Sequence, residues 1–189
     1  YTLVLVKFYG VSANMAPVFL IAFAIGNLAG PLLLGKFFDT VGRKKMIGGT
    51  YIGSGLMLAI SAWMFNEGML TAVTQTIWWC AFFFASAGAS AAYLTVSEIF
   101  PVEVRAKAIA IFFAIAQCFG ALGPVFYGHL IGDGSDTYSL FIGYLFGAAL
   151  MICGGLIGLW LGVNAEGRSL EEVARPLTAV GDVPATSGK

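Results

Sequence analysis

The stretch GKFFDTVGRKK, residues 35–45, confines the charge of a long apolar region to one short loop. It contains Asp39 and three successive bases at 43–45, whereas residues 15–34 and 46–65 on either side carry no charge. A base at the centre of a lipid bilayer costs about 2.5–3.5 kcal/mol, so charged residues are expelled to the loops between membrane spans. The pattern therefore predicts a loop at the membrane surface that joins two transmembrane helices.

The composition of the whole chain supports this interpretation. Of its 189 residues, 59% are hydrophobic and only 11% are charged, and the mean hydropathy is +0.87. A soluble domain carries about 25% charged residues. We therefore interpret the chain as an integral membrane protein whose first partner is the lipid bilayer. The bases form no patch broad enough to indicate a nucleic-acid partner.

Five apolar runs have the length of a membrane span and lack charged residues. They are residues 15–34, 46–65, 70–96, 108–128 and 139–163. Continuous apolar runs predict helices, because the strands of a membrane barrel would alternate apolar and polar residues. The predicted fold is therefore an all-α membrane protein with five complete transmembrane helices.

The two ends of the chain differ from this bundle. Residues 1–10 are apolar but too short to span, and we interpret them as the end of a truncated sixth helix. The five-helix bundle is expected over residues 11–166. Residues 167–189 are more polar and are expected to form a partly disordered cytoplasmic tail.

Lysine and arginine alternate from loop to loop. The loops around Arg43 and Arg105 and the tail from Arg168 contain bases, whereas the loops around Glu67 and Asp133 contain none. Basic loops of membrane proteins face the cytoplasm. We therefore expect the Arg43 and Arg105 loops and the tail to be cytoplasmic in a multi-pass protein of the cell membrane, such as a bacterial inner membrane.

Three loop motifs resemble those of one transporter family. GKFFDTVGRKK resembles the signature G-x-x-x-D-[RK]-x-G-[RK]-[RK] of the major facilitator superfamily, and SEIFPVEVRAKA, residues 97–108, resembles the E-[IL]-F-P-x-x-x-R of its sugar porter branch. EGRSLEEV, residues 166–173, resembles the G-R-[ST]-L-E-E after the last helix of that branch. The motifs keep the family's order. The chain looks like the C-terminal half of such a transporter, from the end of helix seven to helix twelve.

The resemblance implies a secondary active transporter, of the symporter type, for a small polar metabolite such as a sugar or another organic solute. Such proteins work by alternating access, and the N-terminal half of the transporter would be the missing partner. Tyr93 and Gln117 replace two Trp contacts of sugar porters, which puts a sugar substrate in doubt, and the loop motifs depart from the family pattern at two further places. Thr40 stands where the family has a base, and VNAEG, residues 163–167, stands where sugar porters have P-E-T-K-G. A non-transporting receptor or sensor on the same fold is the alternative.

Charged residues of the two basic loops are the predicted gate. Arg43 offers a planar fork of donors to a carboxylate, and Gly42 can take the positive φ of a tight turn. In the family, these loops form a charge network that closes the cytoplasmic side in one state. The resemblance implies the gating set Asp39, Gly42, Arg43, Lys44, Glu98 and Arg105. The alternative is a structural turn whose charges are solvated at the bilayer surface.

Polar residues deep in the spans are the predicted substrate site. Asn27 stands where sugar porters place a substrate-binding Asn, and Tyr93 and Gln117 stand where some place a Trp. Polar and aromatic residues at helical spacing also form a stripe: Gln75, Trp79, Phe82, Ser86, Ser90, Tyr93 and Ser97. The predicted substrate-binding set is Asn27, Ser86, Ser90, Tyr93 and Gln117. Helix packing is the alternative role for these residues.

Other residues carry structural rather than chemical predictions. Glycines four apart predict close helix contacts: Gly26 with Gly30, Gly49 with Gly53, and the series Gly154, Gly158 and Gly162. The single histidine, His129, argues against a metal site, which needs a cluster of ligands, and no enzyme signature is present. We therefore expect no metal and no cofactor. The expected ligand is a small-molecule substrate.

Overall fold

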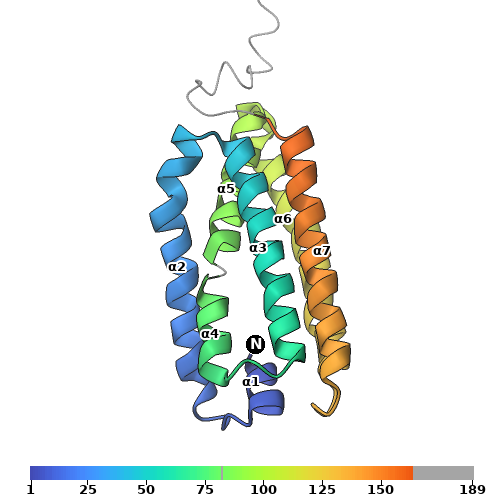
Figure 1. Cartoon of the computed structure of the whole chain (residues 1–189). Helices are drawn as coiled ribbons and strands as arrows, with labels where there is room; N and C mark the ends of the chain where they lie inside the picture. The colour runs from blue at the N-terminus through green and yellow to red at the C-terminus, as the bar shows by residue number, and fades with distance from the viewer. Residues whose placement is uncertain (82, 164–189) are drawn as a thin grey trace, which may run out of the picture.

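The computed structural model of the chain describes residues 1–81 and 83–163. All regular structure in these residues is helical (Figure 1). The helices are α1 (Thr2–Tyr9), α2 (Ala16–Thr40), α3 (Arg43–Asn66), α4 (Ala72–Ala81), α5 (Phe83–Ile99), α6 (Val102–Ile131) and α7 (Thr137–Leu161). The predicted all-α fold is confirmed. The expected tail at 167–189, with the EGRSLEEV motif, lies outside the described residues.

Five helical segments are long and apolar enough to cross a membrane, as predicted. They are α2, α3, the segment Ala72–Ile99, α6 and α7. The span predicted at 70–96 corresponds to α4 and α5, which the structure describes on either side of residue 82. The helix expected at the start of the chain is present as the short α1.

Glycine, proline and one aspartate set the helix ends. Gly10, with φ of 63°, caps α1 in the left-handed conformation, which has no steric cost for glycine. Gly42, with φ of 109°, separates α2 from α3, as the sequence predicted for this turn. Pro101 lies directly before α6, where its missing N–H costs no hydrogen bond. Asp136 caps α7 by accepting hydrogen bonds from two backbone N–H groups of the first turn.

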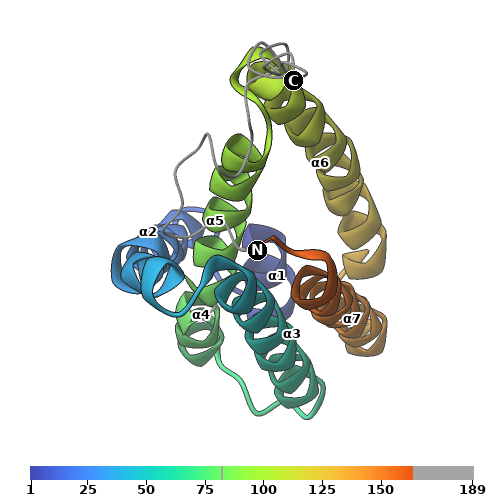
Figure 2. The ribbon, with the colours of Figure 1, turned by 90° about the horizontal axis from the view of Figure 1, so that it is seen from above.

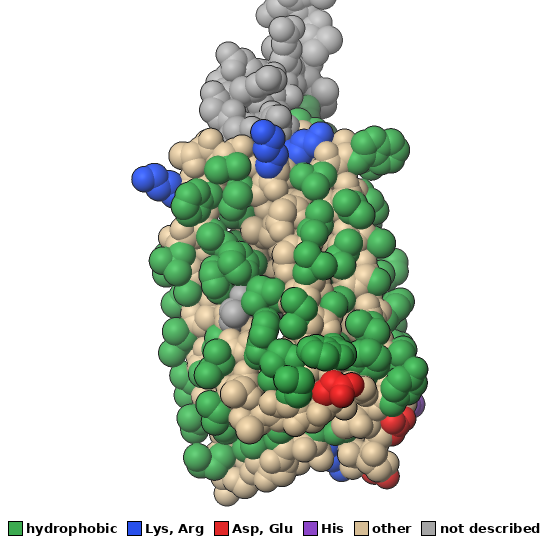
Figure 3. All heavy atoms as spheres, in the orientation of Figure 1, with side chains coloured by type: hydrophobic (Ala, Val, Ile, Leu, Met, Phe, Trp, Pro, Cys, Tyr) green, Lys and Arg blue, Asp and Glu red, His purple; other side chains and the backbone are tan. Residues whose placement is uncertain are grey.

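The two ends of the bundle carry different charge. The α2–α3 and α5–α6 connections lie together at one end, which we call the Arg43 end, and α1 lies at the opposite, Glu67 end (Figure 1). On the face drawn in Figure 3, Lys and Arg gather mainly at the Arg43 end and Asp and Glu at the Glu67 end. The apolar side chains between them cover the length of a bilayer core, as expected for a membrane bundle.

The helices differ in how tightly they pack. Figure 2 shows α3 alongside α7, whereas α6 slopes across the space between α5 and α7. Every residue of α6 from 110 to 122 is exposed. Exposed apolar side chains on a membrane helix contact lipid or a further transmembrane segment. α6 is therefore the least enclosed span of the described bundle.

Glycines bring α3 and α7 into backbone contact. A Cβ atom added to Gly155 would lie 2.8 Å from the carbonyl oxygen of Gly48, and one added to Gly55 would lie 2.8 Å from that of Ala148. On the other side of the bundle, Gly26 lies as close to the backbone of Cys80. Small residues drive helix association in membranes because they allow such close approach.

The glycine pair predicted on α3 was wrong, and so was the first glycine of the series on α7, although Gly158 and Gly162 of that series face α3, where an added Cβ would lie 3.9 Å from Ile47 and 3.2 Å from Lys44. A Cβ atom on Gly49, Gly53 or Gly154 would meet nothing within 4 Å, whereas Gly48 and Gly155 lie at the α3–α7 contact. Spacing alone cannot choose between these sets, because a shift by one residue turns the face of a helix by about 100°. The predicted close packing at Gly26 and Gly30 is confirmed, since both lie against backbone atoms of the α4 and α5 region.

Gly155→Ala should destabilise the bundle, and the adjacent Gly154→Ala should not. A methyl group on Gly155 would lie 2.7 Å from Cγ1 of Ile52, whereas one on Gly154 has open space. Overpacking of this kind costs about 1–3 kcal/mol. Thermal unfolding of the two purified variants in detergent should show a lower melting temperature for Gly155→Ala alone. Equal melting temperatures would mean that the glycine contact does not hold α3 against α7.

Candidate functional site: a charge cluster and an aromatic cavity

An ion-pair cluster joins three helix ends at the Arg43 end. The guanidinium of Arg43, the first residue of α3, pairs with the carboxylate of Glu98 near the end of α5. Its Nη2 atom also lies 3.5 Å from Oδ1 of Asp39, near the end of α2. The side chains of Arg43 and Glu98 are 14% and 21% exposed, whereas that of Asp39 is 70% exposed. The Glu98 contact is therefore the more shielded of the two.

Helix dipoles explain why the charges of Arg43 and Glu98 stabilise each other. A cation at the first residue of α3 faces the positive end of that helix, and a carboxylate near the end of α5 faces its negative end. Each charge is unfavourable beside its own helix end. Pairing Arg43 with Glu98 offsets both terms, so separating α3 from α5 would expose two unfavourable charges at once.

Two further predicted gating residues make different contacts. Nζ of Lys44 donates to the carbonyl oxygen of Trp160 at 3.3 Å, which places a cation at the C-terminal end of α7. Nε of Arg105 donates to the carbonyl oxygen of Phe100 at 3.3 Å. Within the described residues no ion pair joins Arg105 to Glu98. The structure thus brings together the side chains of Asp39, Arg43 and Glu98, whereas the side chain of Arg105 is hydrogen-bonded to a backbone carbonyl.

The predicted substrate residues lie along α2, α5 and α6. Oγ of Ser86 donates to the backbone carbonyl of Asn27 at 2.9 Å, which ties α5 to α2. Oγ of Ser90 donates to the carbonyl of Ser86 at 3.0 Å within α5. Both serine hydroxyls therefore make contacts that also suit a packing role.

Tyr93 and Gln117 lie toward α6. The Tyr93 ring packs edge-on against Phe112, with ring centroids 5.4 Å apart, and is half-buried. Gln117 lies on the exposed face of α6. The structure brings Asn27, Ser86 and Ser90 together, but no described contact joins this group to Gln117. Their assignment to substrate binding stays a prediction.

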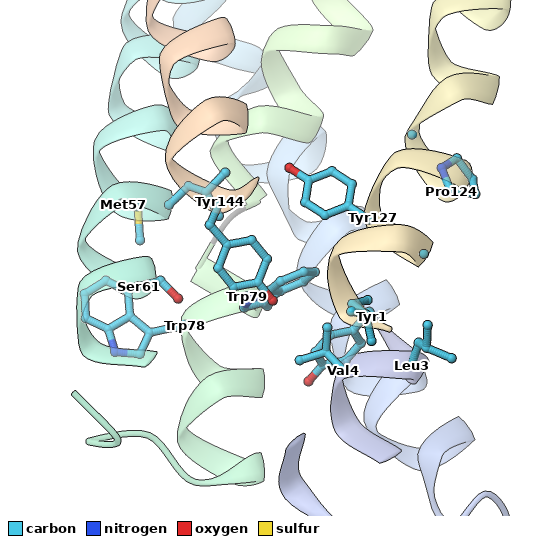
Figure 4. Close-up of a pocket in the computed structure, with 14 residues that line it drawn as sticks. Tyr1, Leu3, Val4, Met57, Ser61, Trp78, Trp79, Pro124, Tyr127 and Tyr144 are labelled. Carbon is cyan, nitrogen blue, oxygen red and sulfur yellow. The ribbon is translucent and has the colours of Figure 1, made fainter. Parts of the chain in front are cut away.

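A cavity of about 500 Å³ opens elsewhere, in the half of the bundle toward the Glu67 end. Figure 4 shows its aromatic walls, with side chains from α3, α4, α6 and α7 around Tyr1 and the start of α1. Its aromatic lining residues are Tyr1, Trp78, Trp79, Tyr127 and Tyr144. None of the five predicted substrate residues lines it.

A buried polar chain supports the cavity wall. Tyr9 Oη donates to Oε1 of the fully buried Gln75 at 2.9 Å, and Nε2 of Gln75 donates to Oγ of Ser61 at 3.1 Å. Ser61 lines the cavity. A primary amide is costly to bury unless its hydrogen bonds are made. The chain of bonds therefore holds α1, α3 and α4 together beneath the cavity.

Of the stripe of polar and aromatic residues predicted from the sequence, only Trp79 lines this cavity. Gln75 and Trp79 begin the predicted stripe, which continues at Phe82 outside the described residues. Tyr127 and Tyr144 gave no periodic signal that set them apart from packing aromatics. Their only sequence feature is a phenol hydroxyl within an apolar run, which requires a partner when buried. Their neighbours across the cavity come from distant parts of the chain.

Comparison with known proteins now identifies the family. The sequence profile of the Major Facilitator Superfamily matches residues 1–184, and the chain belongs to this family. The Glucose facilitated diffusion protein of Zymomonas mobilis subsp. mobilis is 27% identical over 170 residues, which cover 87% of this chain and 35% of that protein. Human Synaptic vesicle glycoprotein 2C is 30% identical over 138 residues, 72% of this chain and 17% of that protein. No solved structure gives a significant match.

The chain thus spans about a third of the length of the Zymomonas relative. The family match confirms the resemblance that the loop motifs predicted. It also agrees with the bundle of membrane-spanning helices described above.

A double-mutant cycle should show that Arg43 couples more strongly to Glu98 than to Asp39. The Glu98 pair is shielded from solvent, so we expect a coupling free energy of about 1–3 kcal/mol. The exposed Asp39 pair should give less than about 1 kcal/mol. Unfolding free energies of the single and double alanine variants measure both values. Equal couplings, or a stronger one with Asp39, would contradict this ranking.

Proposed function

We propose that this chain forms part of a membrane transporter that moves a small, uncharged, polar solute by alternating access. The observation that carries the proposal is the ion-pair cluster of Arg43, Glu98 and Asp39, which ties the ends of α2, α3 and α5 at one side of the membrane. Such a contact is made in one arrangement of the helices and broken in another. It therefore acts as a gate when the equilibrium between two states depends on it.

The character of the spans supports an uncharged solute. The described spans carry their Asp, Glu, Lys and Arg only near the helix ends. A charged solute at the bilayer midplane would require an opposite charge there. Amide, hydroxyl and aromatic groups suit a sugar-like molecule or another neutral organic solute. The name of the Zymomonas relative, which refers to glucose, favours a sugar-like solute.

We place the substrate path along Asn27, Ser86, Ser90, Tyr93 and Gln117. The backbone contact between Asn27 and Ser86 puts these two residues at the α2–α5 interface, and Tyr93 extends the same side of α5 toward α6. Substrates of such transporters bind near the midplane between two bundles.

Asn27→Ala should raise the half-saturation concentration for transport. An unchanged value in a well-expressed variant would assign Asn27 to packing.

Transport needs a second bundle in this proposal. The exposed side of α6 offers the surface that a second half of the transporter would cover. Symport, which the sequence predicts, requires a group that carries the coupling ion. The described spans offer no carboxylate near their middle, so this group would lie outside the described residues. The words "facilitated diffusion" in the relative's name favour the alternative to symport, in which the solute moves without a coupling ion.

The Arg43 end should face the cytoplasm and the Glu67 end the outside, because basic loops are retained on the cytoplasmic side. Single cysteines at Ser135 and Val41, both exposed, report the two ends. The background carries serine at the three native cysteines Cys80, Cys118 and Cys153. An impermeant thiol reagent added to intact cells should label Ser135→Cys and not Val41→Cys. Labelling of Val41→Cys alone would invert the proposed orientation.

Arg43→Ala should reduce uptake by the full gene product several-fold while membrane insertion is retained. Loss of a charge-assisted contact shifts the equilibrium between gate states by about 1–3 kcal/mol. Lys45→Ala removes an exposed base from the same loop and is the matched control. Uptake of radiolabelled glucose and other neutral solutes into liposomes gives the measurement. Equal uptake rates in Arg43→Ala and Lys45→Ala would contradict the gating role of Arg43. Absence of uptake of every solute by the wild type would favour the alternative function, a receptor.

A further inference from the structure

An apolar groove runs between α2 and α3 on the side of the bundle toward the Arg43 end. We propose that this groove holds one acyl chain of an anionic phospholipid, whose phosphate lies against Lys45 at the membrane surface. None of the residues assigned above to the gate or to substrate binding lines the groove. The proposal rests on the position of the groove, on its lining and on the exposed base above it.

The way three helices pack explains why the groove exists. α2 and α3 each pack closely against α5 and only slightly against each other. The space left between them has a volume of about 310 Å³, with Leu34 of α2 and Phe84 of α5 in its walls. No residue before Leu34 lines it. α6, whose exposed side the proposed second bundle would cover, lies across the bundle from α2 (Figure 2). The groove therefore opens toward the lipid.

The length of the groove matches one leaflet of a bilayer. Met46 and Met57 of α3 both line it and lie eleven residues apart. Eleven residues correspond to about 16 Å along a helix. Half of the hydrocarbon core of a bilayer is about 15 Å thick. The groove therefore runs through the apolar layer of the leaflet at the Arg43 end, where a single acyl chain extends over the same depth.

The lining of the groove suits a hydrocarbon chain. Gly49 and Gly53 line it, and a Cβ atom added to either would meet nothing within 4 Å, so the missing side chains leave open space. Its one polar side chain, Thr50, donates to the carbonyl oxygen of Met46 at 2.8 Å within its own helix. Water in the groove would lack polar partners. A transmembrane helix is about 10–12 Å across and is too wide for the groove to enclose.

An exposed base lies above the groove. Lys45 precedes Gly49 by four residues, so both lie on one side of α3, and the lysine is exposed. Within the described residues Lys45 takes part in no ion pair, whereas Arg43 pairs with Glu98 and Asp39. An ammonium group offers three donors and a positive charge. A lipid phosphate at the membrane surface complements both.

The groove and the base select different parts of the lipid. An acyl chain gains little from leaving other lipid tails, because they are as apolar as the protein surface. The groove therefore fixes the position of a chain without distinguishing between headgroups. A base at the membrane surface favours anionic lipids about fivefold. In a zwitterionic headgroup the ammonium group offsets the phosphate, so phosphatidylcholine should bind more weakly than phosphatidylglycerol.

Native mass spectrometry of the delipidated full gene product measures this selectivity. The probes are phosphatidylglycerol and phosphatidylcholine with the same two oleoyl chains, so that only the headgroup differs. We expect one phosphatidylglycerol molecule to bind about fivefold more tightly than phosphatidylcholine. Equal affinity for the two lipids would overturn the proposal.

Lys45→Gln tests the contact with the headgroup. The change should lower the affinity for phosphatidylglycerol about fivefold and leave the affinity for phosphatidylcholine unchanged. Lys107→Gln removes an exposed base of α6 at the same end of the bundle and is the matched control. An unchanged affinity of Lys45→Gln for phosphatidylglycerol, or an equal loss in both variants, would contradict the assigned contact.

Gly53→Leu tests the groove itself. The open space beside Gly53 accepts the new side chain, which then fills the groove, so the melting temperature should stay at the wild-type value. The affinity for both lipids should fall, whereas Gly154→Leu, at an exposed glycine of α7, should preserve it. Gly49→Leu fills the groove at a second point and should repeat the loss. Lipid binding that survives both groove variants would overturn the proposal.

A second copy of the chain is the other occupant that the same spectra detect. It would appear as a dimer that Gly53→Leu disrupts and that added phosphatidylglycerol does not change. That result would assign the groove to an interface between copies and overturn the lipid site. A monomer that carries one phosphatidylglycerol molecule, and loses it in Gly53→Leu, is the result we expect.

Discussion

The exclusion of charge from the hydrocarbon core of a bilayer is the constraint on which this structure depends. Every base and acid must lie near a helix end, and this requirement gathers unlike charges from separate helices at one surface. Arg43, Asp39 and Glu98 meet there because each lies within one turn of the end of its span. The pair of Arg43 and Glu98 also offsets two unfavourable helix-end charges. A requirement for membrane insertion thereby supplies an ion-pair cluster that ties three helix ends together.

Packing inside the bilayer follows a different rule, because lipid tails are as apolar as the side chains and burial drives little association. The close approach of Gly48, Gly55 and Gly155 makes α3 and α7 the most closely packed pair of helices in the described bundle. α6 lacks such contacts over most of its length and contains Pro124. The tight packing of α3 against α7 therefore contrasts with the loose packing of α6. The aromatic cavity lies at this boundary.

How well the sequence predicts a contact of the site depends on how far apart in the chain the two residues lie. Asp39 and Arg43 lie four residues apart in one loop, so their pairing could be anticipated from spacing and charge. Arg105 has the right charge and lies at the right surface, yet its Nε donates to the carbonyl of Phe100, across the turn at Pro101. The cavity was missed for a stronger reason. Its walls come from five helices, and no local pattern marks residues that meet only after those helices pack.

The sequence by itself determined the membrane class, the five spans, their loops and the charged end, because hydropathy and charge act on each segment independently of its neighbours. It also carried the family, through loop motifs that are local in the chain. Only the tertiary structure decided which glycine faces a neighbouring helix, since a shift of one residue turns that face by about 100°. It likewise decided that Trp79 and Tyr144 share a cavity. Both outcomes depend on how helices rotate and tilt against each other, which is set by contacts between distant segments.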